Sequence, residues 1–264
     1  MIILNNPYII KKKKIRRKVL VTQIIVLVVF ILLWEVLARF NVINDFLFSK
    51  PSSIFFLIVN YFKTGEIYNH IGISLLETVL GLVIGTSLGL LIAIVLWWNE
   101  FLSKVFDPFL VVLNALPKTA LAPILIIWAG TGISGITVVA VSISLVLTII
   151  SGYNYFKSIE DEKIKMLTSL GAKKYQVLLK LIIPSNIPNI INIIKINIGM
   201  TWVGVIVGEF LVSRAGIGYL IVYGSQVFKM DVVMAGVIIL AIIAYLMYQL
   251  VNIIEIKVKR KRGK

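Results

Sequence analysis

The residues that could do chemistry in this chain are a few charged and polar side chains inside long apolar segments. Glu77, Lys118 and Glu209 are ionisable residues in such segments, where a charge is costly and usually faces other protein or a water-filled path. His70 is the only histidine and there is no cysteine, so thiol chemistry is excluded and no metal site is predicted. No phosphate-binding loop of the Gly-x-x-x-x-Gly-Lys-Ser/Thr type occurs, so the chain itself is not expected to hydrolyse ATP.

A second polar pattern lies between residues 190 and 212. Asn197, Thr201, Gly204 and Gly208 follow one another at i, i+4, i+7 and i+11, which places them on one face of a helix. This face either lines a translocation path or forms interhelical hydrogen bonds, which contribute only about 0.6 kcal/mol each in a membrane. Together with Glu77, Lys118 and Glu209, these four residues are the candidate lining of a path.

The elements that must position these residues are membrane spans. Hydrophobic residues make up 59% of the chain and charged residues 15%, which indicates an integral membrane protein. A span needs roughly 20 apolar residues. Six segments qualify, and they predict an all-α fold with one membrane domain over 19–256, flanked by basic tails at 1–18 and 257–264. These segments are about 20–40, 73–98, 106–130, 134–154, 190–212 and 232–254.

Local features refine this arrangement. Gly81, Gly85 and Gly89 lie four residues apart and predict a face where another helix packs closely. Pro117 and Pro123 predict an interrupted third span, in which Lys118 either lines a path or pairs with Glu77 or Glu209. Three local features are also expected: a Glu35 that either snorkels to the membrane interface or pairs locally, a helix after the turn at 49–53 and a turn at 99–108.

The basic residues indicate the orientation. The net charge is +15, and its largest clusters precede the first span, follow the last span and occupy the segment 157–188. With six spans these clusters share one side, and the positive-inside rule makes that side cytoplasmic, with both termini. Anionic lipid headgroups are a sufficient partner for the basic ends, so no nucleic acid is predicted.

The segment 157–188 is the longest polar interruption between spans and is predicted to be a docking element. Ser158 and Asp161 have the spacing of an N-capping box, and Gly171 should end the first helix in the left-handed conformation. A second amphipathic helix should present one apolar face and end at Pro184. The residues of that face are Tyr175, Leu178, Leu179 and Ile182.

Gly171-Ala172 followed by Ile182-Ile183-Pro184 resembles the E-A-A loop of permease subunits of ATP-binding-cassette importers. Further motifs place the resemblance in the nitrate/sulfonate/taurine branch and extend it over nearly the whole chain. They are Pro51-Ser52, Ser74-Leu75, Gly81, Asp107-Pro108, Pro117, Ala120, Pro123, Trp128, Gly130, Glu209 and Gly216-Ile217-Gly218-Tyr219.

This resemblance implies a type I importer permease that forms a homodimeric pore. Two separate ATPase subunits would bind the cytoplasmic loops. An extracytoplasmic solute-binding protein would deliver a small anion or organic solute of the nitrate/sulfonate/taurine class. No catalytic residue and no cofactor are expected in the chain. The residues implied to contact the ATPase are Asp161, Lys165, Met166, Leu167, Leu170, Gly171, Ala172, Tyr175 and Pro184.

Two positions depart from the pattern. Lys165-Met166-Leu167 stands where the family has Glu-Ala-Ala, and Glu77 stands where the branch usually has arginine.

The sequence bears on two other classes of function. A membrane-embedded enzyme is disfavoured because there is one histidine, no cysteine and no expected close pair of intramembrane carboxylates. A channel or proton-coupled carrier that uses Glu77, Lys118 and Glu209 remains the alternative.

Overall fold

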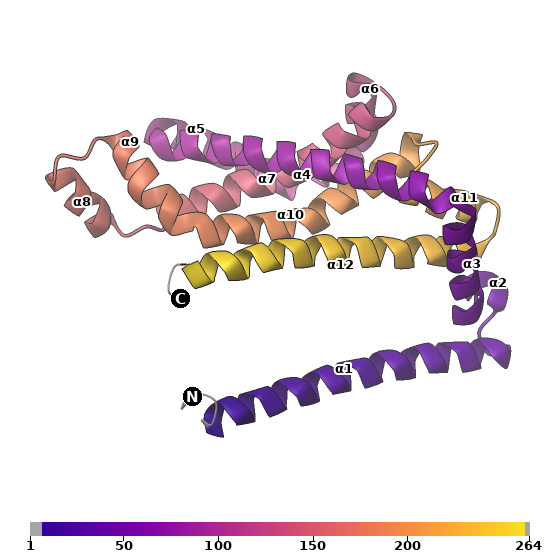
Figure 1. The fold of residues 1–264 in the computed structure, drawn as a ribbon. Helices are drawn as coiled ribbons and strands as arrows, with labels where there is room; N and C mark the ends of the chain where they lie inside the picture. The colour runs from indigo at the N-terminus through magenta and orange to yellow at the C-terminus, as the bar shows by residue number, and fades with distance from the viewer. Residues whose placement is uncertain (1–6, 262–264) are drawn as a thin grey trace.

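The computed structural model describes residues 7–261, and this part of the chain contains only helices and their connections (Figure 1). The helices are α1 Pro7–Arg39, α2 Asp45–Phe48, α3 Pro51–Thr64, α4 Glu66–Trp98, α5 Glu100–Ala115, η2 Lys118–Leu121, α6 Ala122–Ala129, α7 Ile133–Lys157, α8 Asp161–Ser169, α9 Lys174–Val177, the π-helical η3 Leu178–Ile182, α10 Ile183–Val212, α11 Ile217–Gln226 and α12 Met230–Lys261. The predicted all-α fold is confirmed.

Five stretches of this part are long and apolar enough to cross a membrane. A sixth candidate is the pair Glu100–Ala115 and Lys118–Ala129, which passes the same test together and is bent by 87°. The predicted interruption of the third span is therefore confirmed. Pro117 explains it, because a proline holds the preceding residue away from the helical region, and Leu116 is extended with φ −65° and ψ 134°.

Helix α7 lies at the centre and is packed against α4 through small residues. Gly81, Gly85 and Gly89 face Ala140, Ser144 and Thr148, each one helical turn further along α7. A Cβ added to Gly81 would lie 2.7 Å from the Ala140 Cβ, closer than van der Waals contact allows. The close-packing face predicted from the four-residue spacing is confirmed.

Helix α10 packs on α7 in the same way. Its Gly204 and Gly208 lie against Ala140 and Ile136, and a Cβ on Gly208 would lie 3.1 Å from the Ile136 Cα. Ala140 thus contacts the glycines of both neighbouring helices. The α4–α7–α10 layer is held by backbone proximity, which suits a membrane where apolar burial provides little driving force between helices.

Helix α1 lies apart from the other long helices (Figure 1). Its apolar side chains are largely exposed along the span, as expected of a surface that a bilayer or another chain covers. Glu35 forms an ion pair of 2.7 Å with Arg39 and accepts hydrogen bonds of 3.0 Å from the Ser52 N–H and hydroxyl. Of the two alternatives for Glu35, local pairing is the one observed, and it connects α1 to the start of α3.

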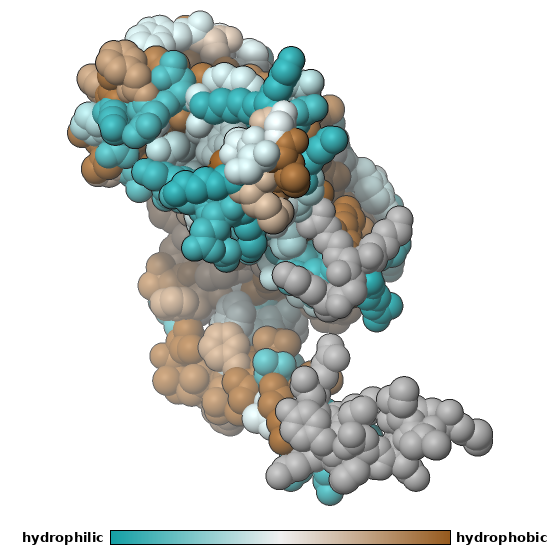
Figure 2. Space-filling view, turned by 90° about the vertical axis from the view of Figure 1, so that its left-hand side faces the viewer, coloured by the Kyte–Doolittle hydropathy of each residue, from teal (hydrophilic) through white to brown (hydrophobic). Residues whose placement is uncertain are grey.

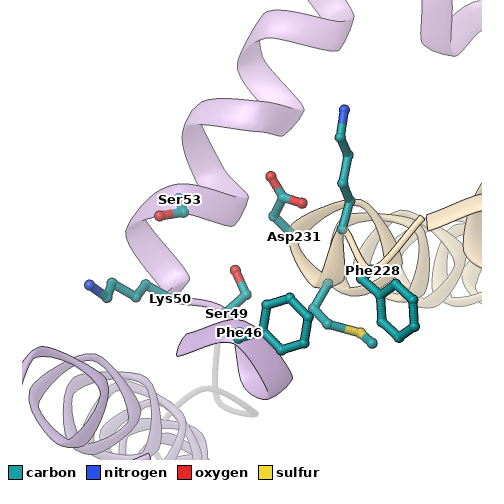
Figure 3. Close-up of a pocket in the computed structure, with 8 residues that line it drawn as sticks. Phe46, Ser49, Lys50, Ser53, Phe228 and Asp231 are labelled. Atoms are coloured by element: carbon teal, nitrogen blue, oxygen red, sulfur yellow. The ribbon is translucent and has the colours of Figure 1, made fainter. Parts of the chain in front are cut away.

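Short elements close the end of the molecule at which α3 lies. The helix predicted after Pro51 is confirmed as α3. Figure 3 shows Phe46 of α2 beside Phe228 of the α11–α12 turn, with ring centroids 6.0 Å apart, at a hollow of about 290 Å³. This stacking connects α2 to the turn that precedes α12.

The predicted turn at 99–108 is wrong. A single residue, Asn99, separates α4 from α5, and its side-chain Oδ1 accepts hydrogen bonds from the N–H groups of Phe101 and Leu102. This N-cap satisfies the free donors of the new helix, so the chain resumes helical geometry at once. Pro108 lies inside α5 without ending it.

The start of α1, the end of α12 and the α8 segment lie at one end of the molecule, called here the loop end (Figure 1). The three basic clusters therefore belong to the same end, as predicted. The predicted tail at 1–18 is helical from Pro7 onward. Residues 1–6 and 262–264 of the two tails lie outside the described residues.

Candidate functional site

The segment 157–188, the coupling loop, turns sharply at Gly171. This glycine has φ +83°, a left-handed conformation that side chains disfavour. The Gly171 N–H donates to the Thr168 carbonyl at 2.9 Å and the Ala172 N–H donates to the Leu167 carbonyl at 3.0 Å. These are the two bonds of a Schellman motif, so the predicted helix end at Gly171 is confirmed. A Cβ on Gly171 would meet no atom within 4 Å, so glycine is favoured here for its backbone conformation and not for lack of space.

The capping box predicted at Ser158 is wrong. Ser158 ends α7, and its hydroxyl donates to the Tyr155 carbonyl at 2.9 Å. The N-cap of α8 is Glu160, whose side chain makes no capping hydrogen bond. A serine at a helix end competes for nearby backbone carbonyls, and here that local bond prevails. Asp161 and Glu162 still place negative charge at the start of α8, where the helix dipole favours it.

The second helix of the loop does not end at Pro184, contrary to prediction. It runs from α9 through η3 into α10, with Pro184 in the first turn of α10. The π-helical turn at Leu178–Ile182 explains this, because it shifts the hydrogen-bond register directly before the residue that lacks an N–H. The loop is therefore continuous with a membrane helix and can transmit its movement.

The predicted apolar face of this helix is divided. Leu178 and Ile182 are buried with Val177 against Ala93 and Phe156, in one hydrophobic cluster. Tyr175 and Leu179 are 50% and 60% exposed. The π turn changes the angular spacing of side chains, which a regular 3.6-residue period does not anticipate.

The residues expected to contact an ATPase also divide by burial. Leu167 and Ala172 pack on the cluster beneath the loop, and Pro184 is half-buried. Met166 and Leu170 are 59% and 78% exposed. The remaining members, Asp161, Lys165, Gly171 and Tyr175, are exposed. Figure 2 views the loop end directly and shows hydrophobic side chains among hydrophilic ones on this face.

At the opposite end, Glu77 of α4 and Glu209 of α10 meet inside the protein. Each residue is 1% exposed, and the two side chains lie close together in the packed interior. Glu209 also accepts hydrogen bonds from the Ser74 hydroxyl and the Gly218 N–H. The expectation of no close carboxylate pair in the membrane is therefore wrong. The two residues are distant in sequence, and only the packing of α4 on α10 brings them together.

The turn before α11 closes over this carboxyl pair. Gly216 has φ +124°, and a Cβ on Gly218 would lie 2.8 Å from the Glu209 Oε2. The His70 Nδ1 accepts a hydrogen bond of 3.0 Å from the Gly216 N–H, and its ring stacks on Tyr219 at 5.9 Å. Both glycines are thus needed for the close approach of this turn to Glu209.

Lys118 does not take part in this site. Its Nζ donates to the Asn114 carbonyl at 3.2 Å, and no ion pair of Lys118 with Glu77 or Glu209 is present among the described side chains. The predicted pairing with an acid is wrong. Helix η2 begins at Lys118, just after the bend at Pro117, which turns this residue toward its own preceding turn.

The polar face of α10 is packed between helices. The Asn197 Nδ2 donates to the hydroxyl oxygens of Thr86 at 2.8 Å and Thr148 at 2.6 Å. Thr201 is fully buried and contacts the Gly81 face, while Gly204 and Gly208 contact α7. This geometry favours close packing between helices for the four residues, with interhelical hydrogen bonds only at Asn197. A role in lining a path stays a prediction.

Comparison with known proteins identifies the architecture. Residues 85–260, about two thirds of the chain, match the model of the family "Binding-protein-dependent transport system inner membrane component". The chain belongs to this family. It is accordingly the permease component of an ATP-binding-cassette importer, in which the ATPase is a separate subunit, and the predicted resemblance is confirmed.

Individual relatives agree with this assignment. The chain is 28% identical over 236 residues to the putative aliphatic sulfonates transport permease protein SsuC of Bacillus subtilis, covering 89% of this chain and 85% of that protein. It is 24% identical to the taurine transport system permease protein TauC of Escherichia coli, covering 84% and 82%. An inward-facing structure of the MetNI methionine ABC transporter has the same fold, with a TM-score of 0.65, 18% identity and coverage of 73% and 95%.

The sequence analysis did not predict the role of Lys174 in this importer permease. The Lys174 Nζ donates to the Trp98 carbonyl at 2.6 Å and lies 5.8 Å and 5.6 Å from the ring centroids of Trp97 and Trp98. The last carbonyls of a helix lack intrahelical partners, so Lys174 satisfies one at the end of α4. The available signal was a Trp-Trp pair at the end of an apolar span, together with a lysine at the start of the second helix of the coupling loop.

Proposed function

We propose that this chain forms the translocation pathway of an ATP-binding-cassette importer and couples to two ATPase subunits through the coupling loop. The observation that carries the proposal is the exposure of apolar side chains on an otherwise polar loop, held by the Gly171 turn and the Lys174 anchor. Exposed apolar groups on a water-facing surface indicate a protein contact. The continuous α9–η3–α10 helix then transmits movement of the loop into the membrane.

The contact surface consists of Met166, Leu170, Tyr175 and Leu179, framed by Asp161 and Lys165. Leu167, Ala172 and Pro184 support it from beneath. Gly171 sets the angle between the two halves of the loop. Lys165 supplies a positive charge where the family pattern has an acid, so the matching ATPase surface is expected to be acidic or neutral at that point.

The loop end is cytoplasmic, with both termini, because the basic clusters gather there. The chain works as a homodimer in the cell membrane, where anionic lipids contact the basic ends. An extracytoplasmic solute-binding protein docks at the opposite end. The relatives named for sulfonate and taurine transport support a small anion or organic solute of the nitrate/sulfonate/taurine class. Glu77 and Glu209 lie near the entrance of the path, with Lys118 at the bend of the third span.

The test is reconstitution of the chain with its partner ATPase and solute-binding protein. Leu170→Asp should abolish co-purification of the ATPase and transport, because a charge would be buried in the contact. Phe101→Asp is the matched control, since Phe101 is an exposed apolar residue of α5 outside the loop, and it should retain both. Retention of ATP-driven transport by the Leu170 variant would contradict the proposal. Transport that needs no ATP and follows a pH gradient would favour the proton-coupled carrier.

A further inference from the structure

Polar side chains hold the loop-end half of α12 to α10. The Lys195 Nζ of α10 donates to the Asn252 Oδ1 of α12 at 2.8 Å and forms an ion pair with Glu255. It also lies 5.1 Å from the ring centroid of Tyr248. Only 10% of the Lys195 side chain and 14% of the Glu255 side chain are exposed. Tyr248, Asn252 and Glu255 follow at i, i+4 and i+7, so one face of α12 converges on a single lysine.

This ion pair differs from several others in the described part of the chain, which join neighbours on one helix. Lys104 pairs with Glu100 and Lys259 pairs with Glu255, in each case four residues away. Lys195 and Glu255 are 60 residues apart and belong to different helices. Lys195 contacts one oxygen of the Glu255 carboxylate and Lys259 contacts the other, so this carboxylate connects the buried lysine to the exposed end of α12.

Apolar burial does not explain the attachment of this half of α12. The buried hydrophobic side chains of α12 are Val232, Ala235 and Ile239, all near its start. Every described residue of α12 after Ile239 is half-buried or exposed. Apolar contacts between helices also give little specificity in a membrane, because lipid is an equally suitable partner. The Lys195 contacts therefore specify how the loop-end half of α12 lies on α10.

A buried ion pair of this kind contributes more to geometry than to stability. Removing both charges from water costs about as much as their attraction returns, so the net gain in the free energy of folding is small. Breaking the pair by removing one partner is costly, because the other charge stays buried. The pair is satisfied in one register of α12 against α10, and a shift of one helix alone would break it. The two helices are therefore expected to move together.

Both helices lead to functional parts of the molecule. Helix α10 continues the coupling loop through α9 and η3. The start of α12 packs closely on α11, since a Cβ added to Gly224 would lie 3.0 Å from the Val232 Cβ. A Cβ added to Gly236 would lie 2.7 Å from the Ile221 Cγ1. The turn before α11 closes over Glu209, so a movement of α12 reaches the end of the molecule opposite the loop.

We propose that Lys195 is a positioning residue of the transport cycle, whose pair with Glu255 makes α12 move with α10 when the coupling loop moves. Helix α12 then carries the movement through α11 to the turn over Glu209. The inference rests on the proposed function for the force that acts on the loop. The attachment of α12 to α10 is a property of the permease alone and can be measured without its partners.

The first measurement is the distance between spin labels on the loop ends of the two helices, by double electron–electron resonance in lipid nanodiscs. The chain has no cysteine, so Ser185→Cys on α10 and Ile256→Cys on α12, both at exposed positions, can be labelled selectively. Labelled chain is mixed with an excess of unlabelled chain, so that the distance is measured within one chain. The protein with the ion pair intact should give one narrow distance distribution.

The decisive variant is Lys195→Met with Glu255→Met, which removes the pair without leaving one buried charge alone. Its thermal unfolding midpoint should stay close to that of the unmodified chain, because apolar residues of similar size replace a buried ion pair at little cost. The spin-label distribution should nevertheless broaden. Lys195→Arg keeps the charge and should keep the narrow distribution. If the double variant does not fold, Lys195→Gln with Glu255→Gln takes its place, with the same expected broadening.

The second measurement is transport by the reconstituted importer. The double variant should retain the ATPase subunits and their basal ATP hydrolysis, while the amount of solute transported per ATP falls about fivefold. The matched control is Glu100→Met with Lys104→Met, which removes an ion pair within α5 and should change neither the distance distribution nor transport per ATP.

A narrow distribution in the double variant would overturn the inference, and so would unchanged transport per ATP. Both outcomes would leave the importer assignment intact. If the unmodified chain shows no ATP-driven transport, the proposed function fails, and the spin-label result still decides whether the ion pair holds α12 to α10.

Discussion

The two ends of this permease differ in opposite ways from what their surroundings favour. The coupling loop exposes apolar side chains, such as Leu170 at 78%, where water would favour polar ones. The opposite end buries Glu77 and Glu209 to 1% exposure, where a membrane favours apolar side chains. The exposed apolar side chains of the loop mark a surface for a protein partner, whereas the buried Glu209 has its hydrogen-bond partners within the protein. Such departures are more informative about function than the regular spans between them.

The end with the buried pair should be the more sensitive to loss of a side chain. Glu209→Ala would leave the Ser74 hydroxyl, the Gly218 N–H and Glu77 without their shared partner. We expect a loss of about 3 kcal/mol or more in the free energy of unfolding, measured by denaturation of the purified protein. Glu160→Ala, at an exposed position of the loop, should change it by less than about 0.5 kcal/mol. Equal effects would remove the distinction between the two ends.

Glycine substitutions sharpen the comparison. Gly218→Ala would place a Cβ 2.9 Å from the Glu209 Cβ, so overpacking should cost about 1–3 kcal/mol. The variant should be compared in thermal unfolding with Gly72→Ala on α4, where an added Cβ meets nothing within 4 Å. Gly72→Ala should be neutral or slightly stabilising. A neutral Gly218→Ala protein would mean that the turn does not need to approach Glu209 so closely.

Gly171→Val tests the other end, where space is open but the backbone is left-handed. The variant should lose about 1–2 kcal/mol of local stability from the φ of +83° and, in the reconstituted importer, most of its stimulation of ATP turnover. Gly171→Asn is the control, because asparagine tolerates this conformation better, and it should retain more coupling. Full coupling in the valine protein would show that the angle of the loop does not matter.

The smallest expected effect is at the anchor of the loop. Lys174→Met removes the bond to the Trp98 carbonyl and the contacts with both indole rings, with a cost of about 1 kcal/mol. Amide hydrogen exchange in residues 161–177 should become faster. Exchange in the part of α4 that precedes Ala93 should not change. Lys165→Met, at an exposed position in the same loop, should leave the exchange pattern as it is.

Much of the fold was predictable because membrane spans are marked by composition and close packing by spacing. The bend at Pro117, the helix end at Gly171 and the small-residue face of α4 each follow from local chemistry that needs no distant partner. The errors in the loop and turns lie where a competing local hydrogen bond or an unusual backbone geometry prevails over the expected pattern. The Ser158 hydroxyl donates to a carbonyl of α7 and does not cap α8. Asn99 alone takes the place of the longer turn, and the helix continues through Pro184 after the π turn.

The sequence by itself determined that this chain crosses the membrane, which residues form its spans and where its coupling loop turns, since these depend on apolar length, proline and glycine. Only the tertiary structure decided the partners of the buried polar groups. Glu77 meets Glu209 and not Lys118, and Asn197 reaches Thr86 and Thr148. Lys174 rests on two tryptophans. These pairings join segments far apart in the chain, and they depend on the rotation and depth at which the helices pack, which no local pattern encodes.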